Sequence, residues 1–351
     1  MGNLRAVSGV DFNGYGFLGK GGKLKLEGFL NELPDLAFFH SNSNNFTESV
    51  PDVNFITKIR FLYELDLSNN KLTGPFPKQV LQAKNLTFLD LRFNNYAGPI
   101  PADVFKLDVQ VIFLNNNNFE QNIPDSIDKT PALYLTFANN KFTGPIPRSI
   151  GFGNTSNNLL EVLFLNNKLS GCLPYEIGQL KKITLFDASK NLITGPIPQS
   201  FACLNKIEIL NFANNLLYGD VPELVCKLPN LQSLTLSSNY ITEVGPECRK
   251  LIKKGRLDVR NNCILDLPNQ RSKEVCADFF KKNPRDCLQN KWMFYLPCRK
   301  QFVYDTQANQ LSDGRQLFDS SDDDDDDEPD STRRSSSSRP VSYAALTPNG
   351  L

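Results

Sequence analysis

The sequence predicts an α/β solenoid, curved and built from about ten coils, with a parallel sheet on its concave face. Three observations predict this architecture. A motif of the form L-x-L-x-x-N recurs at near-constant spacing, a G-x-I-P segment or a variant of it follows most copies, and all eight cysteines lie between Cys172 and Cys298. The 351 residues therefore form one repeating body with a Cys-rich C-terminal cap rather than several domains.

One central asparagine marks each copy of the motif. Successive marks lie 23 to 27 residues apart, which is the period of leucine-rich repeats. The marks are Asn44, Asn70, Asn94, Asn117, Asn140, Asn167, Asn191, Asn215, Asn239 and Asn262.

Each copy has a structural interpretation. The two apolar residues of L-x-L point inward from a short strand and stack on their equivalents in neighbouring coils. The asparagine stands where the chain leaves the strand, so its amide can bond backbone groups left free by the turn. A glycine then permits a tight bend, and the following I-P leads an extended segment across the side of the coil. The bend glycines are Gly74, Gly98, Gly144, Gly171, Gly195 and Gly219.

The chain divides into four parts. Residues 1–30 form an irregular first coil, 31–262 the repeats, 263–300 the Cys-rich cap and 301–351 a tail. Two copies depart from the pattern. The copy marked by Asn44 has Ser41 at an inward position, and the copy marked by Asn167 contains an insertion and reads as one residue short in its strand. We expect both to bulge and interpret them as tolerated, with a functional role as the alternative.

The net charge of zero is the sum of two unequal parts. From residue 301 onward there are 11 acidic and four basic residues, which leaves 34 basic against 27 acidic in residues 1–300. The balance of the whole chain speaks against nucleic acid as a partner. The tail combines Asp322–Asp327 with a serine run, cannot form a core and is expected to be disordered.

Several classes of enzyme are excluded by composition. His40 is the sole histidine, which excludes a Ser-His-Asp triad and a multi-histidine zinc site. Asp66 and Asp90 lie one coil apart, so a carboxylate pair acting on a glycan is an alternative. Such pairs also occur in solenoids for structural reasons, and we predict no enzyme activity, metal or cofactor. No apolar stretch is long enough for a membrane span.

The cysteines are predicted to form disulfides in an oxidising compartment. A four-cysteine zinc site is the competing interpretation, but no C-x-x-C pair supports it. Cys226 and Cys248 lie about one coil apart and are expected to pair. Cys172 with Cys203 is a weaker pair, and an exchange of partners between these two pairs stays open. The remaining four, Cys263, Cys276, Cys287 and Cys298, would pair within the cap.

The compartment follows from the cysteines rather than from a signal sequence. No secretory signal is visible, which conflicts with disulfides, and we interpret the recorded start as truncated. The expected location is therefore secreted. Asn45, Asn85 and Asn154 stand in glycosylation sequons, and Asn154 is the best candidate because it lies in the insertion.

Longer motifs carry a family resemblance. FHSNSNNF (39–46), LYELDLSNN (62–70), NLTFLDLRFN (85–94), GCLPYEIG (171–178) and CILDLPNQRSKEVC (263–276) resemble leucine-rich repeat extensins, and especially their extensin-free relatives. The resemblance covers roughly residues 5–298. It implies a plant-type, extracellular repeat that is secreted to the cell wall or apoplast. In the extensins the repeat domain binds small Cys-rich peptides, so a peptide partner is implied. This chain lacks the Ser-Pro-rich extensin tail, so wall anchoring is not implied.

The concave face is the predicted binding surface. Residues flanking the inward pair of each strand point to it, and aromatic side chains with polar neighbours occupy its middle coils. Lateral packing between strands is the alternative interpretation of these aromatics. The predicted binding residues are Phe88, Asp90, Arg92, Phe113, Asn115, Tyr134, Thr136, Phe164 and Asp187.

The favoured function is therefore a non-catalytic module that binds a peptide or protein, with wall polysaccharide as a further candidate partner. The alternative is an inhibitor of a wall-degrading glycosidase, similar to polygalacturonase inhibitors. Asp66, Asp90 and Asp187 on the concave face argue against that alternative, because they would repel an acidic enzyme or pectin.

Overall fold

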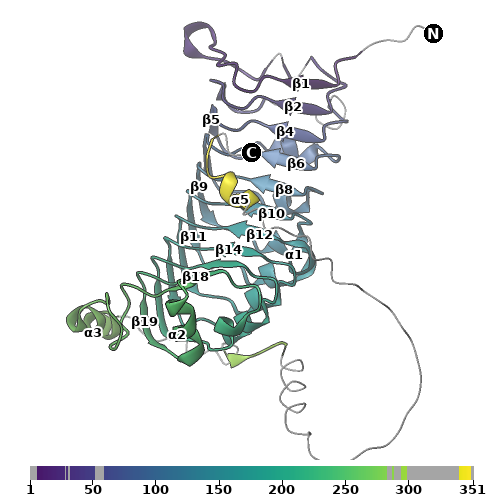
Figure 1. Ribbon diagram of the computed structural model, residues 1–351. Helices are drawn as coiled ribbons and strands as arrows, with labels where there is room; N and C mark the ends of the chain where they lie inside the picture. The colour runs from purple at the N-terminus through teal and green to yellow at the C-terminus, as the bar shows by residue number, and fades with distance from the viewer. Residues whose placement is uncertain are drawn as a thin grey trace, which may run out of the picture.

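The computed structural model describes residues 6–27, 29–30, 32–51, 59–282, 287, 294–298 and 340–348. These residues form a curved stack whose concave face is an 11-stranded, entirely parallel sheet (Figure 1). The fold predicted from the repeat spacing is confirmed. The strands are β1 (Gly9–Asp11), β2 (Phe38–His40), β4 (Glu64–Asp66), β6 (Phe88–Asp90), β8 (Val111–Phe113), β10 (Tyr134–Thr136), β12 (Glu161–Leu163), β14 (Leu185–Asp187), β16 (Ile209–Asn211), β18 (Ser233–Thr235) and β20 (Leu257–Asp258).

A second parallel sheet of nine strands runs along the side of the stack. Its strands begin just after the marker asparagines, ahead of the extended segment that the sequence predicted after the bend glycines, and this sheet was not predicted. The bend glycines end or interrupt these strands, and Gly195, for example, has a φ of 91°. The strands are β3 (Thr47–Glu48), β5 (Lys71–Gly74), β7 (Asn95–Gly98), β9 (Asn118–Asn122), β11 (Lys141–Gly144), β13 (Lys168–Cys172), β15 (Leu192–Gly195), β17 (Leu216–Val221) and β19 (Tyr240–Val244).

Short helices complete the coils. Six of the 3-10 helices are preceded directly by a proline, whose fixed φ and missing N–H suit the residue before a helical turn. The 3-10 helices are η1 (Lys20–Gly22), η2 (Lys78–Gln82), η3 (Ala102–Lys106), η4 (Asp125–Lys129), η5 (Arg148–Gly151), η6 (Tyr175–Gln179), η7 (Gln199–Cys203) and η8 (Val225–Lys227). The α-helices are α1 (Gly153–Asn158), α2 (Pro246–Lys253), α3 (Lys273–Lys282) and α5 (Val341–Ala344).

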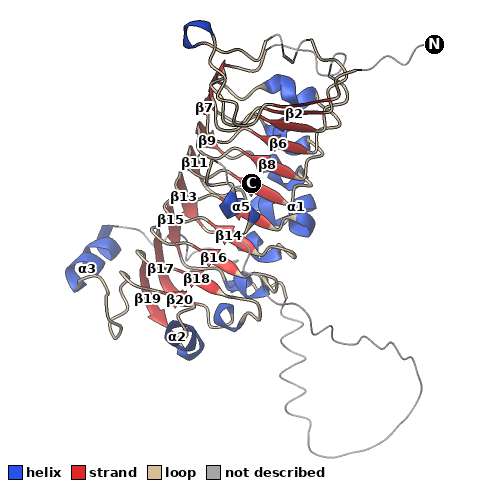
Figure 2. Cartoon of the chain, turned by 45° about the horizontal axis from the view of Figure 1, so that its top comes forward, coloured by secondary structure: helices blue, strands red, loops and turns tan. Residues whose placement is uncertain are grey.

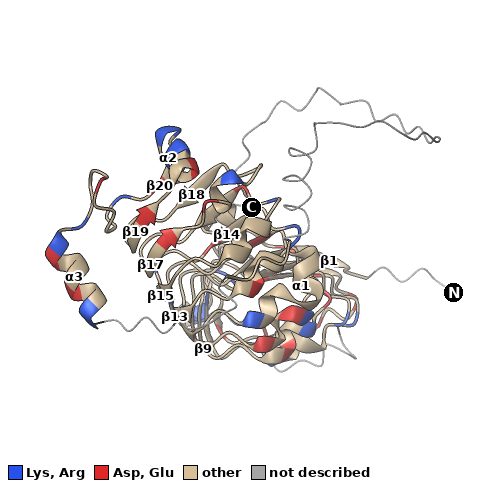
Figure 3. Cartoon of the chain, turned by 90° about the horizontal axis from the view of Figure 1, so that it is seen from below, with Lys and Arg blue, Asp and Glu red and all other residues tan. Residues whose placement is uncertain are grey.

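Lysine and arginine lie beside acidic residues on α2 and α3 at the C-terminal end of the stack (Figure 3).

The asparagine ladder has the role that the sequence predicted. Asn94 Oδ1 accepts the N–H of Leu72 in the preceding coil at 3.0 Å. Its Nδ2 donates to the carbonyl of Leu67 at 2.9 Å and to two carbonyls of its own turn. The other central asparagines from Asn70 to Asn262 repeat this arrangement, so each coil satisfies backbone groups of the one before it.

The coil marked by Asn167 is regular, and the predicted register of its strand was wrong by one residue. Glu161 pairs with Tyr134 on one side and Leu185 on the other, so Val162 and Phe164 are the inward pair. Phe164 is fully buried and its ring centroid lies 5.5 Å from that of Phe137. The strand is not one residue short, because the insertion is accommodated earlier as α1.

The copy marked by Asn44 also keeps the sheet register, because β2 pairs with β1 and β4 without a shift. Ser41 occupies its inward position and is fully buried there.

Two of the four disulfides join the Cys-rich cap to the middle coils, and the other two are local. Cys226–Cys248 is confirmed, and Cys263 pairs with Cys276 within the cap as expected. The pairing of Cys172 with Cys203 was wrong, and so was the expectation that Cys287 and Cys298 find their partners within the cap. The structure forms Cys172–Cys287 and Cys203–Cys298, which span 115 and 95 residues of sequence. Residues 294–298 therefore pack beside coils far from them in the chain.

The cap bonds the backbone groups of the last repeat, which has no following coil. In the middle of the stack the N–H groups at the marker turn donate to carbonyls of the next coil, as Asn94 does to Asn116. At the end, Asn261 N–H donates to the Asn269 carbonyl at 2.7 Å. Asn262 N–H donates to the Gln270 side-chain oxygen at 3.1 Å.

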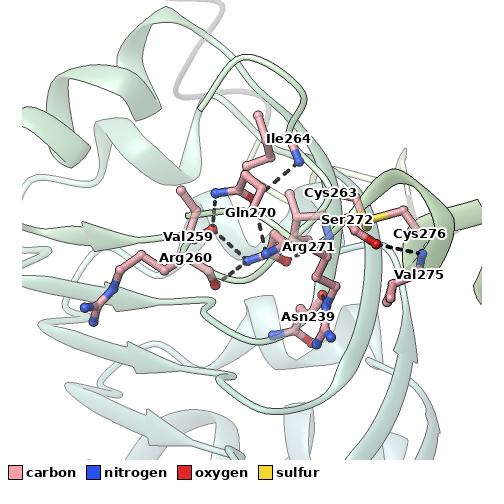
Figure 4. The surroundings of a disulfide bond; sticks show 12 residues. Asn239, Val259, Arg260, Cys263, Ile264, Gln270, Arg271, Ser272, Val275 and Cys276 are labelled. Carbon is pink, nitrogen blue, oxygen red and sulfur yellow. Dashed lines mark hydrogen bonds between the residues drawn. A yellow bond between two sulfur atoms is a disulfide. The ribbon is translucent and has the colours of Figure 1, made fainter. Parts of the chain in front are cut away.

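The amide nitrogen of Gln270 makes a second contact with the last coil. Gln270 Nε2 donates to the Val259 carbonyl at 3.1 Å, so one amide satisfies a donor and an acceptor of the last coil. The Cys263–Cys276 bond then holds α3 beside this turn (Figure 4).

Part of the tail departs from the expected disorder. Residues 301–339, including the acidic run, lie outside the described residues, so the prediction for them stays a prediction. Residues 340–348 form α5 and the turn after it, with Ser342 and Ala345 fully buried. Across the described ranges, no helix has the length and apolar character needed to cross a membrane.

Candidate functional site

The C-terminal segment, residues 340–348, lies on the concave face against the middle strands (Figure 2). Its helix α5 packs over β10 and β12, which come from coils about 200 residues earlier in the chain. Three polar side chains of the sheet hold it, one each from β12, β14 and the turn after β8. We call the surface formed by Asn115, Glu161, Asp187 and their apolar neighbours the concave site.

Glu161 anchors the start of the helix. Its Oε2 accepts the backbone N–H of Ser342 at 2.6 Å. Burial raises the pKa of Glu161 above its ordinary value, and the hydrogen bond from Ser342 opposes that rise. A carboxylate at the first turn of a helix binds N–H groups that have no partner within the helix.

Asp187 binds the only aromatic side chain of the segment. The Tyr343 hydroxyl donates to Asp187 Oδ2 at 2.6 Å, and Asn211 Nδ2 donates to the same oxygen at 2.9 Å. Asp187 Oδ1 accepts the N–H of Ser189 at 2.8 Å. Both carboxylate oxygens are therefore occupied, and the carboxylate is oriented by its own strand to receive the phenol.

Asn115 binds the end of the helix. Its Nδ2 donates to the Ala345 carbonyl at 2.9 Å, and its Oδ1 accepts the hydroxyl of Thr136. A helix C-terminus presents carbonyls without intrahelical partners, so a side-chain amide is a suitable donor there. Glu161 and Asn115 together bind the N-terminal and C-terminal groups of one helical turn.

Apolar residues form the floor of the concave site. Ala138, Leu163 and Leu185 are buried on the concave face of neighbouring strands, with Leu165 and Ile209 half-buried beside them. Tyr343 and Leu346 of the segment pack on this cluster. Leu163 and Leu165 take the concave-face positions that the sequence had assigned to Phe164 and Asn166. The apolar floor therefore continues through this coil.

Three of the predicted binding residues meet in the concave site: Asn115, Thr136 and Asp187. Phe164 does not, because it belongs to the core, where its ring packs between Phe137 and Phe186. Glu161 was missed by the same error of one residue. Counting six positions back from the marker Asn167, as in every other coil, would have found it.

The other predicted residues form a neighbouring cluster on β6 and β8. Asp90 and Arg92 are buried, and Arg92 Nε lies 3.0 Å from Asp90 Oδ2. The guanidinium of Arg92 lies 5.6 Å from the centre of the Phe113 ring, which packs edge-on against Phe88. Burial raises the pKa of Asp90, and Arg92 partly offsets the rise. Tyr134 is half-buried on β10.

The aspartates of this column have a structural role. Asp66, Asp90, Asp187 and Asp258 each accept the backbone N–H two residues later, at 2.8 to 3.1 Å. Each carboxylate thus closes the turn at the end of its own strand. The spacing that suggested a catalytic Asp66–Asp90 pair arises from this repeated turn.

Ionisation of Tyr343 should be displaced to alkaline pH. Burial first, and then the Asp187 carboxylate, raise the pKa of this phenol above its ordinary value of 10.0. The docked segment therefore keeps a proton that a free tyrosine releases. The contribution of the phenol to docking is complete below about pH 10 and is lost as the pH rises above it.

The measurement is a spectrophotometric tyrosinate titration of the protein and of Tyr343→Phe. The difference between the two curves should titrate above pH 10. A midpoint at or below 10 would show that the phenol is not docked on Asp187.

The sequons differ in exposure. Asn85 and Asn154 are exposed and Asn45 is half-buried. Asn154 lies on α1, and its side-chain amide donates to the Lys129 carbonyl at 2.7 Å. Glycosylation at these positions stays a prediction.

Two comparisons with known proteins identify the repeat from the sequence. The Leucine Rich Repeat family model matches residues 61–82 and 230–251. Receptor-like protein 32 of Arabidopsis thaliana is 36% identical over 74 residues, which is 21% of this chain and 8% of that protein.

Two solved plant receptors are similar in structure. The peptide hormone receptor RGFR1, in complex with RGF2, matches with a TM-score of 0.62 and 25% identity, over 74% of this chain and 39% of its own. The ectodomain of GASSHO1/SCHENGEN3 from Arabidopsis thaliana, in complex with CASPARIAN STRIP INTEGRITY FACTOR 2, matches with a TM-score of 0.61 and 25% identity, over 73% and 33%. The chain thus spans well under half the length of these relatives. The chain folds as a leucine-rich repeat solenoid, and it is similar to the ectodomains of plant receptors.

Proposed function

We propose that this protein is a non-catalytic, extracellular recognition module that binds a short peptide in the concave site. The observation that carries the proposal is that Glu161, Asp187 and Asn115 already hold a peptide segment, the chain's own residues 340–348. They bind a backbone N–H, a phenol and a backbone carbonyl, which are groups that any peptide ligand with a tyrosine can offer. The two similar receptors were solved with peptide or protein partners, which supports the same use of the fold here.

The compartment is part of the proposal. Four disulfides among the described cysteines favour an oxidising environment, and the plant-type repeat favours the cell wall or apoplast. Inhibition of a wall-degrading glycosidase remains the second hypothesis from the sequence. The acidic residues Asp90, Glu161 and Asp187 on the concave face disfavour it for an acidic partner, as they disfavour wall pectin.

The test uses the full chain with Tyr343→Ala, so that its own segment competes less for the site. A fluorescently labelled peptide with the sequence of residues 340–348, PVSYAALTP, is titrated by anisotropy. We expect saturable binding, and Asp187→Ala in the same background should weaken it about 10- to 100-fold, because a hydrogen bond to a charged group is lost.

Asp66→Ala is the matched control, because Asp66 closes the same turn on β4, whereas α5 packs on β10 and β12. Its effect on peptide affinity should be small. Absence of saturable binding, or equal weakening by the two substitutions, would overturn the proposed function. Oligogalacturonide titrated in place of the peptide tests the polysaccharide alternative, and its saturable, Asp187-dependent binding would contradict the peptide assignment.

A further inference from the structure

We propose that residues 340–348 are a built-in competitor for the concave site, and that the peptide partner shares their pattern. That pattern is a tyrosine with a small residue immediately before it and another small residue two positions after it. The proposal rests on the proposed function, since it names the regulation and the ligand class of the same site.

The contacts are those of a ligand rather than of a loosely packed tail. Ser342 N–H, Tyr343 hydroxyl and Ala345 carbonyl each meet a different polar side chain of the sheet at 2.6 to 2.9 Å. Leu346 adds an apolar contact on the floor of the site. A tyrosine that packs on apolar side chains while its hydroxyl is hydrogen-bonded is typical of a recognition interface.

Size selectivity follows from burial. Ser342 and Ala345 have no exposed surface, so the positions before the tyrosine and two after it are enclosed. A large side chain at either position would need space that the sheet already fills. Thr347 and Pro348 are exposed, so residues at those positions are not selected.

The tyrosine gives chemical selectivity. Asp187 is held by Ser189 N–H and Asn211 Nδ2, so it presents one oxygen to a donor. A phenylalanine in place of the tyrosine would leave that oxygen with one hydrogen-bond partner fewer. A site built to bind a hydroxyl rejects an analogue that lacks it, because a buried polar group then loses its partner.

The length of the chain makes competition effective. About 40 residues of sequence separate Cys298 from Pro340, so the segment is covalently tethered to the solenoid that carries its site. Tethering at this length gives an effective concentration of about 1 mM. If the free peptide binds with a dissociation constant of about 10 μM, the tethered segment weakens binding of an external peptide about 100-fold.

The experiment compares three full-length proteins: wild type, Tyr343→Ala and Thr347→Ala. Labelled PVSYAALTP is titrated into each. We expect Tyr343→Ala to bind it about 10- to 100-fold more tightly than wild type. Thr347→Ala should behave as wild type, because Thr347 is exposed and its hydroxyl donates to the Ala344 carbonyl of its own turn. Equal saturable binding to wild type and Tyr343→Ala would overturn the competitor while leaving the proposed function intact.

Peptide variants test the ligand class in the Tyr343→Ala protein. PVSFAALTP, which lacks the hydroxyl, and PVLYAALTP, which enlarges the enclosed position before the tyrosine, should both bind at least ten-fold more weakly than PVSYAALTP. Equal affinities for the three peptides would overturn the recognition pattern. Failure of all three to bind would instead overturn the proposed function itself.

Sedimentation decides whether the segment acts on its own chain. A monomer across protein concentrations supports the tethered competitor. A dimer that Tyr343→Ala dissociates would place the segment on a second copy and overturn it.

Discussion

Replacing Cys172 and Cys287 together by alanine is expected to lower the free energy of unfolding by about 4 kcal/mol. The bond joins residues 115 apart, but Cys203–Cys298 already connects the same two regions. With that second bond intact, the shortest ring closed by Cys172–Cys287 contains about 40 residues, and closing it removes entropy from the unfolded chain accordingly. Denaturant unfolding at 25 °C measures the loss.

Two comparisons make this prediction specific. Cys263→Ala with Cys276→Ala removes a bond that spans only 13 residues and should cost about 1 kcal/mol less. The single substitution Cys172→Ala should release one thiol at Cys287, detectable by alkylation and peptide mapping. A released thiol at Cys203 would instead support the pairing first expected from the sequence.

The second large effect is expected at Phe164. Phe164→Ala should lower the free energy of unfolding by about 3 to 5 kcal/mol, because it leaves a cavity in a fully buried stack of aromatic rings. The core of a solenoid is shared between coils, so the cavity also weakens the packing of both neighbours. Thermal or denaturant unfolding measures it.

Phe88→Ala is the matched control, since Phe88 points to the concave face and is half-exposed. It should cost about 1 kcal/mol. Equal losses at the two positions would mean that Phe164 lies on the surface, as the first register implied, and that Glu161 does not reach the concave site.

The sequence predicted the candidate site in part. Asp187, Asn115 and Thr136 were identified because their coils have the regular spacing between strand and marker asparagine. Glu161 was missed because its strand contains a run of leucine and phenylalanine, which fits the inward positions of either register. The pattern of alternate positions has a period of two, so a shift of one residue exchanges every inward and outward side chain.

The docked segment left a weaker signal. Residues 341–346 are the apolar stretch that follows the acidic and serine-rich runs, and a short apolar stretch in a polar tail is itself a candidate docking motif. The composition of the whole tail is polar, so a prediction from composition assigned this stretch to the disordered tail. Its position on β10 and β12 depends on the shape of a surface assembled from several coils.

The sequence by itself determined the coil, the inward and outward sides of most strands, and the ladder of central asparagines. These features arise from contacts between a coil and its immediate neighbours, so they repeat with the same period as the residues that make them. The tertiary structure decided the partners of Cys172 and Cys203 and the place of residues 340–348. Those contacts join residues 95 to 230 apart in the sequence, from Cys203–Cys298 to Asn115–Ala345. No repeat relates such residues, and only the folded solenoid brings them close enough to bond.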